Sequence, residues 1–142
     1  MAYDFDLVVI GGGPAGEKGA VQAAYFGKKV ALVERAPSPG GACVHTGTLP
    51  SKTLRETSIA LSGYRQAELY GLTIELNRDL AVPKLLSRKD AVRGLEVSRI
   101  LWNLDRHNVQ LLKGRAELID NHTIRIVGSG TSGPRTVTAD RF

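Results

Sequence analysis

The feature that most constrains the fold is a glycine-rich turn between an apolar segment and a helical one. Gly11, Gly13 and Gly16 have the spacing G-x-G-x-x-G and follow the apolar run at 7–10. In a strand–turn–helix unit, the first glycine permits a tight turn and the second lets the backbone approach a pyrophosphate. The third lets the helix pack closely on the strand. The spacing alone also fits a simple glycine-rich turn, so its context decides.

That context is a strand–helix–strand unit. The apolar run at 7–10 predicts a strand buried on both faces of a parallel sheet. A helix is predicted over 14–26 and a second strand over 30–33, which completes the unit. Pro14 suits the first helical turn, where its missing N–H is not required. Together with Ala15 it stands at a helix N-terminus, whose N–H groups and dipole attract phosphates. The turn is therefore predicted to bind a dinucleotide.

An acidic residue follows the second predicted strand. Glu34 lies eighteen residues beyond Gly16, near the distance at which a carboxylate meets the two hydroxyls of a ribose. A carboxylate there repels a 2′-phosphate and so disfavours NADP at this site. The neighbouring Arg35 weakens that exclusion and is counted with the cofactor-binding residues.

The rest of the chain is predicted to be helical and then β-rich. A loop is expected over 36–50 and a helical segment over 51–107, with Ser51 as the first helix's cap. In the later part of that segment, Val97, Leu101 and Leu104 recur at helical spacing. The fold class is therefore α/β, a Rossmann-like parallel sheet with helices, followed by a small antiparallel β-meander at 109–138. The strands expected in that meander are 109–112, 116–119, 123–127 and 136–138.

Composition excludes several kinds of function. The nineteen Lys and Arg residues give a net charge of +5 but are interleaved with acids, which favours a solvated surface and predicts no nucleic-acid partner. Cys43 is the single cysteine, and no histidines share metal-ligand spacing, so no disulfide and no metal site are predicted. No apolar run approaches the roughly 18–20 residues of a membrane span, and the acidic N-terminus does not resemble a secretory signal. These observations predict a cytoplasmic protein without a membrane partner.

The segment from Gly40 to Lys52 is the most distinctive part of the chain. It resembles the flavin-facing segment of the pyridine nucleotide–disulfide oxidoreductases, whose pattern is Gly-Gly-x-Cys-x-x-x-Gly-Cys-x-Pro-Ser-Lys. Residues 113–116 resemble that family's Gly-x-Ala element, whose backbone meets the adenine. The resemblance implies FAD as cofactor and NAD(P)H as co-substrate. It adds to the expected cofactor-binding residues Gly41, Ala42, Cys43, Gly47, Thr48, Lys52, Arg115 and Ala116.

One departure from the family pattern changes the expected chemistry. The family's second redox cysteine is replaced here by Thr48, and a dithiol relay needs two sulfurs. The branch of soluble transhydrogenases shares this substitution and also has a histidine at the position of His45. The resemblance to that branch implies hydride transfer between NADPH and NAD through FAD. A diverged reductase that passes electrons to a quinone or another acceptor is the alternative.

The resemblance also suggests roles for three catalytic candidates. Lys52 would lie near flavin N5, although a solvated lysine in a first helical turn is the ordinary reading. Thr48 would face the flavin in place of sulfur. Cys43 is either a small buried residue or a thiol near the flavin, and His45 is assigned no role.

Family members are longer than this chain. The resemblance therefore implies that residues 1–142 are the N-terminal part of an incomplete FAD-binding domain, with residues 139–142 leading into a further strand. Nicotinamide nucleotides would bind a domain absent from this chain, and the parent protein would be a homodimer. A short, non-catalytic nucleotide-binding module is the alternative from a different class.

Overall fold

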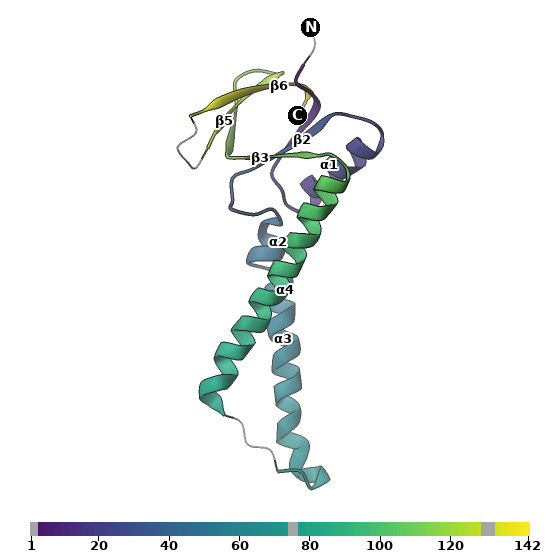
Figure 1. Ribbon diagram of the computed structural model, residues 1–142. Coiled ribbons are helices and arrows are strands. Elements are labelled where there is room, and N and C mark those ends of the chain that lie inside the picture. The colour runs from purple at the N-terminus through teal and green to yellow at the C-terminus, as the bar shows by residue number, and fades with distance from the viewer. Residues whose placement is uncertain (1–2, 74–76, 129–132) are drawn as a thin grey trace. The chain divides into compact units, whose positions relative to one another are not determined.

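The computed structural model describes residues 3–73, 77–128 and 133–142 (Figure 1). Parts of the predicted helical segment 51–107 and of the predicted loop at 128–134 lie outside these residues. The chain divides into two compact units, which are described separately. The first comprises Met1–Gly41 with Val97–Phe142, and the second comprises Ala42–Glu96.

The first unit is built on parallel strands joined by a helix, as the glycine turn predicts. β1 pairs in parallel with β2, and β2 pairs in parallel with β3, so that Val8 lies opposite Ala31 and Leu32 opposite Leu111. The helix α1 connects β1 to β2 and contacts both strands. This arrangement confirms the Rossmann-like α/β class. The bounds are β1 Phe5–Ile10, α1 Pro14–Tyr25, β2 Val30–Glu34 and β3 Gln110–Lys113.

An antiparallel meander follows β3 directly and completes the strand order β3-β2-β1-β6-β5-β4. β6 belongs to both parts of the sheet, because Val137 pairs antiparallel with Ile124 of β5 and Ala139 pairs in parallel with Phe5 of β1. The strand predicted at 136–138 was therefore too short, since residues 139–141 continue it beside β1. The bounds are β4 Arg115–Leu118, β5 Thr123–Val127 and β6 Arg135–Arg141.

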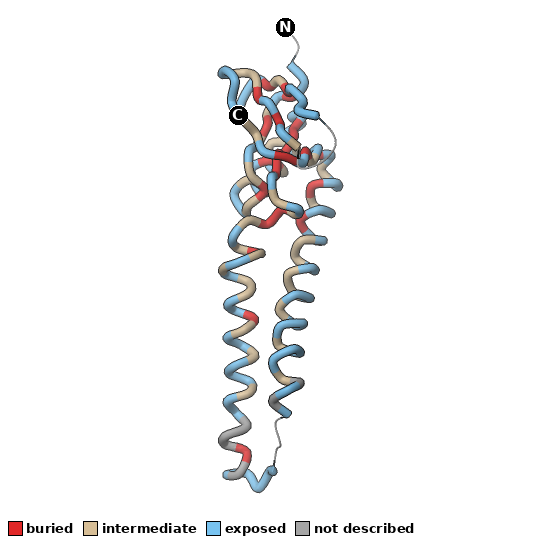
Figure 2. Tube along the Cα trace, turned by 90° about the vertical axis from the view of Figure 1, so that its left-hand side faces the viewer, coloured by how far each residue is buried: buried red, intermediate tan, exposed pale blue. Residues whose placement is uncertain are grey.

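The hydrophobic core of this unit forms between the parallel strands and the inner face of the meander. Ile124 and Ile126 of β5 pack with Val8 and Leu112, and all four are at most 3% exposed. β2 is buried at all five residues, as expected of a strand covered on both faces. For β1 that expectation was wrong, because Ile10 is 48% exposed. β6 pairs with β1 only as far as Leu7, so Ile10, at the end of β1, has no residue of β6 beside it. Figure 2 shows many of the buried residues in the part of the chain that contains these strands, with others along the helices.

The last part of α4 (Arg78–Arg106) packs in this unit with a different face from the predicted one. Ile100 is 3% exposed and Leu104 is 2% exposed, whereas Leu101 is 40% exposed. The buried stripe therefore runs through Val97, Ile100 and Leu104, which are three and four residues apart and share one helix face. Leu101 points outward together with Trp102, which is 59% exposed.

The second unit is helical over much of the segment expected to be a loop. The helix α2 spans Gly41–His45 and α3 spans Thr48–Ser62, followed by a 3₁₀ helix, η1, at Gly63–Tyr70. α3 begins before Pro50 because the first-turn N–H groups of a helix need no partner, so a proline is tolerated there. Ser51 does not cap the helix, since its hydroxyl donates to the Gly47 carbonyl at 2.6 Å. Among the described residues, no helix is long and apolar enough to cross a membrane.

Candidate functional site: the glycine turn

Two glycines in the turn are required by its geometry. Gly11 has a φ of +100°, a region that side chains disfavour, and its N–H donates to the Val33 carbonyl at 2.8 Å. A Cβ on Gly16 would collide with the carbonyl oxygen of Gly11. The turn is thereby tied to the end of β2, and the start of α1 lies directly against it.

The N-terminus of α1 is open to a ligand. Gly13 is the N-cap and makes no side-chain capping hydrogen bond, while Pro14 is the first helical residue and has no N–H. The first intrahelical bond recorded runs from Glu17 N–H to the Gly13 carbonyl at 2.9 Å. The N–H groups of Ala15 and Gly16 therefore lie in the first turn, where a helix supplies no acceptor of its own. Such groups, with the helix dipole behind them, bind phosphate oxygens.

The carboxylate of Glu34 lies against the same turn. It is 8% exposed, and its Oε2 accepts the N–H of Gly12 at 2.7 Å. Its Oε1 accepts the N–H of Ala36, also at 2.7 Å. An ionised carboxylate has about four acceptor positions, so both oxygens keep capacity for a hydroxyl donor. The neighbouring Arg35 is exposed.

A second pair of glycines closes on the first. The N–H of Gly40 donates to the Gly12 carbonyl at 2.7 Å. A Cβ on Gly41, whose φ is +56°, would lie 3.0 Å from the Cα of Gly13. The two backbones are therefore in contact, and the predicted residues Gly13 and Gly41 meet. The roles of Gly12 and Gly40 were missed, although each stands beside a glycine that the motif did single out.

The turn after β3 contacts the backbone of Glu34. Gly114 N–H donates to the Glu34 carbonyl at 2.9 Å, and Lys113 Nζ donates to the Pro37 carbonyl at 2.6 Å. Gly114 has a φ of +143°, and a Cβ there would lie 2.7 Å from a side-chain carbon of Ile126. Because Gly114 has no side chain, β4 can start directly after β3.

The predicted adenine-side residues follow at once. Arg115 is exposed, and Ala116 is partly buried against the core. Both belong to the strand that begins at the turn touching Glu34. The structure thus gathers the glycine turn, Glu34 and this segment in one unit. These groups fit two parts of an ADP moiety: open N–H groups for the pyrophosphate and a carboxylate for the ribose. FAD and NAD both contain that moiety.

The remaining predicted residues lie in the second unit. The N–H of Gly47 donates to the Ala42 carbonyl at 2.7 Å, and a Cβ on Gly47 would lie 3.2 Å from that oxygen. This contact turns the chain from α2 into α3. Cys43 in α2 is partly buried and is a free thiol. Thr48 and Lys52 are the first and fifth residues of α3, and both are exposed.

Two carboxyl groups outside the turn have lowered pKa values. Hydrogen bonds from the backbone and side chain of Thr138 lower the pKa of Asp4, the residue before β1. A backbone hydrogen bond from His122 lowers the pKa of Asp120, between β4 and β5. Among the described residues, no three metal-ligating side chains gather. An open depression of about 580 Å³ lined by 118–122 and 140–142 contains no predicted site residue.

Comparison with known proteins identifies relatives of the whole chain. Residues 5–142 match the sequence profile of the pyridine nucleotide-disulphide oxidoreductases. The chain is 44% identical over 137 residues to a soluble pyridine nucleotide transhydrogenase of Mycobacterium tuberculosis, covering 96% of this chain and 29% of that protein. It is 33% identical over 141 residues to the protein of that name from Shigella boydii, covering 99% of this chain and 30% of that protein.

The chain also resembles a solved flavoprotein structure. The HOCl-induced flavoprotein disulfide reductase RclA of Escherichia coli, solved as its Cu(II) complex, superposes with a TM-score of 0.71 at 28% identity. The match covers 98% of this chain and 27% of that chain. The chain thus spans less than a third of these relatives. The likeness confirms the prediction of a flavoprotein fold.

Proposed function

The chain belongs to the pyridine nucleotide-disulphide oxidoreductase family, and from this premise we propose that it holds the ADP half of FAD in a larger transhydrogenase. The observation that carries the proposal is the glycine turn with the Glu34 carboxylate bonded across it. Its transhydrogenase relatives support the activity. In this assignment, residues 1–142 form the N-terminal part of the FAD-binding domain.

The chain's own residues divide the work of binding. The N–H groups of Ala15 and Gly16 receive the pyrophosphate, and the Glu34 carboxylate accepts the ribose hydroxyls. Arg115 and Ala116 contribute the segment that meets the adenine. FAD, when bound, supplies hydride acceptance from one nicotinamide nucleotide and donation to another.

The reactive end of the cofactor falls to the Gly41–Lys52 segment. Lys52 is a cation that would favour negative charge on the reduced flavin, and Thr48 takes the position of a redox cysteine. Cys43 is the only cysteine in the chain, so these residues hold no dithiol that could relay electrons. The transfer we propose is NADPH plus NAD⁺ to NADP⁺ plus NADH, which balances without a thiol.

The proposed protein is a cytoplasmic homodimer that binds nicotinamide nucleotides through a further domain. No nucleic-acid or membrane partner is proposed, since its charges are interleaved. A second candidate is a flavoprotein reductase that passes electrons to a quinone or other acceptor. The 28% identity to a flavoprotein disulfide reductase supports a flavoprotein reductase in general, without indicating a quinone as the acceptor. A non-catalytic nucleotide-binding module is the third.

The test uses the longer protein that begins with this chain. Purified enzyme is given NADPH and thio-NAD⁺, and reduced thio-NAD⁺ is followed by absorbance with no thiol added. We expect transfer that survives both iodoacetamide treatment and Cys43→Ser. Transfer that needs added dithiol, or reduction of quinone without any transfer to thio-NAD⁺, would contradict the transhydrogenase assignment.

Thr48→Cys gives a matched gain-of-function control. The substitution restores the family's two-cysteine pattern with Cys43, so oxidation should remove two titratable thiols. The wild type has one thiol in this chain, Cys43, so oxidation should form no disulfide within the chain.

A further inference from the structure

A buried acid in the first turns of α1 has no place in the function described so far. Glu17 is the fourth residue of α1 and is 2% exposed. Carboxylates are almost never this deeply buried unless they are paired. Its hydrogen-bond partners Arg99 and Asn103 come from α4, more than eighty residues along the chain, and lie with it in the first unit.

The contacts of Glu17 are an ion pair and a short hydrogen bond. Arg99 approaches with two guanidinium nitrogens, one to each carboxylate oxygen, both at 3.4 Å. Asn103 Nδ2 donates to Oε1 at 2.8 Å, and Lys18 Nζ lies 3.5 Å from the same oxygen. The guanidinium of Arg99 remains 43% exposed. The Glu17 carboxylate is therefore held within the first turns of α1, and its charge is compensated chiefly by Arg99 of α4.

The same residue is connected to the glycine turn through its backbone. Glu17 N–H donates to the Gly13 carbonyl and so closes the turn that exposes the N–H groups of Ala15 and Gly16. Side chains of a helix lean toward its N-terminus, which brings the carboxylate toward the phosphate end. The charge at Glu17 and its compensation by Arg99 must then act on an anion bound there.

We propose that Glu17 and Arg99 form a charge-setting pair that tunes how tightly the glycine turn holds the pyrophosphate of FAD. The inference rests on the proposed FAD site and deepens it. Glu17 weakens binding of the anion, and Arg99 offsets that effect. Both are positioning residues, since neither is assigned a contact with the cofactor. Through Glu17, Arg99 of α4 would influence the affinity for the cofactor without contacting it.

The size of the effect follows from Coulomb's law. At an effective dielectric constant near 20, two unit charges about 10 Å apart interact strongly enough to change an affinity by about tenfold. Glu17→Gln keeps the shape and an oxygen for Asn103 but removes the charge. It should tighten FAD binding by about tenfold while lowering the Tm, because an ion pair is lost.

The experiment titrates FAD into the 142-residue chain by calorimetry, with Tm measured by circular dichroism. Arg99→Met should weaken FAD binding by about tenfold, and the Glu17→Gln/Arg99→Met double variant should return within about threefold of wild type. Arg99→Lys should bind like wild type and serves if Arg99→Met does not fold. Asp90→Asn makes the same charge change on an exposed residue of the second unit and should change nothing.

A purely structural role gives a different pattern. In that case Glu17→Gln and the double variant would both weaken binding in step with their loss of Tm, and the proposal would be overturned. An unchanged affinity in Glu17→Gln would overturn it too. Failure of the wild-type chain to bind FAD at all would instead refute the proposed cofactor site, and with it this inference.

Discussion

Glu34→Gln is the substitution that most sharply tests how the candidate site is held together. The Glu34 carboxylate is buried and accepts two backbone N–H groups, from Gly12 and Ala36, each at 2.7 Å. A glutamine side chain has the same shape but only one acceptor oxygen. Its NH₂ group must face one of the two N–H donors, which leaves that donor without a partner.

The expected cost can be worked from these bonds. A hydrogen bond to a charged group contributes about 1.5–3 kcal/mol, and an unsatisfied buried donor costs about 1–3 kcal/mol. The two costs are not fully additive, because one substitution removes the charge and leaves the donor unsatisfied. We therefore expect Glu34→Gln to lower the free energy of unfolding by about 3 kcal/mol. For a chain of this length, that corresponds to a Tm lower by roughly 10 °C.

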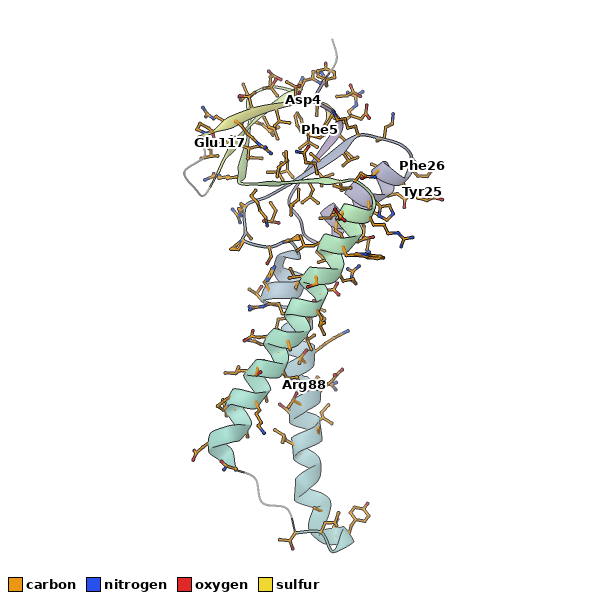
Figure 3. All side chains as sticks on the ribbon, viewed as in Figure 1. Asp4, Phe5, Tyr25, Phe26, Arg88 and Glu117 are labelled. Carbon is orange, nitrogen blue, oxygen red and sulfur yellow. The ribbon has the colours of Figure 1, made fainter. Side chains whose placement is uncertain are left out.

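Urea denaturation followed by circular dichroism measures this directly. Glu117→Gln is the matched control. Glu117 of β4, labelled in Figure 3, pairs with Arg125 of β5 at 2.9 Å, and the two side chains are 38% and 53% exposed. Exposed pairs contribute about 0.2–1 kcal/mol, so the control should lose less than 1 kcal/mol. A Glu34→Gln protein within about 0.5 kcal/mol of wild type would refute the reasoning.

Three further predictions follow from the same structure. Leu104→Ala should cost about 3 kcal/mol of unfolding free energy in urea melts, whereas Leu101→Ala should cost less than about 1 kcal/mol; equal losses would contradict the observed helix face. Gly16→Ala should abolish ADP binding by calorimetry, because its Cβ would strike the carbonyl that turns the chain after β1; retained affinity would show that the turn yields easily. The folded-state pKa of Asp4 is lowered by Thr138, so its contribution is present above the unfolded pKa and is lost as pH falls through the folded pKa. Asp4→Asn should therefore be less stable than wild type at pH 7, with the gap in urea midpoints closing below about pH 3.8; a gap independent of pH would contradict this.

Much of the nucleotide-binding unit was predictable because its determinants are local. The glycine spacing, the proline at the start of α1 and the acid after β2 each constrain residues within one strand–helix–strand unit. The structure gives β1, α1 and β2 nearly the predicted bounds and sets Glu34 against the turn. Here one short motif specifies both a fold and a charge arrangement.

The sequence-based predictions failed where contacts between residues distant in the sequence determine the structure. Periodicity alone did not distinguish Ile100 from Leu101, because the packing partner selects the buried face. The dual pairing of β6 requires knowing that residues 139–141 lie beside β1. The Glu17–Arg99 pair joins two helices that no local pattern connects. The segment 36–50 was expected to be a loop from its glycines and prolines, yet Pro50 is compatible with the first turn of α3.

The most direct test of the central claim is FAD binding by this chain with ADP as competitor. FAD fluorescence is titrated with the 142-residue protein, and ADP is then added. The account predicts saturable one-to-one binding that ADP displaces and Gly16→Ala abolishes. The affinity should lie below that of a full-length relative, because this chain spans less than a third of its relatives and would supply only part of the contacts to the flavin. Absence of saturable binding, or binding that ADP and Gly16→Ala leave unchanged, would contradict it.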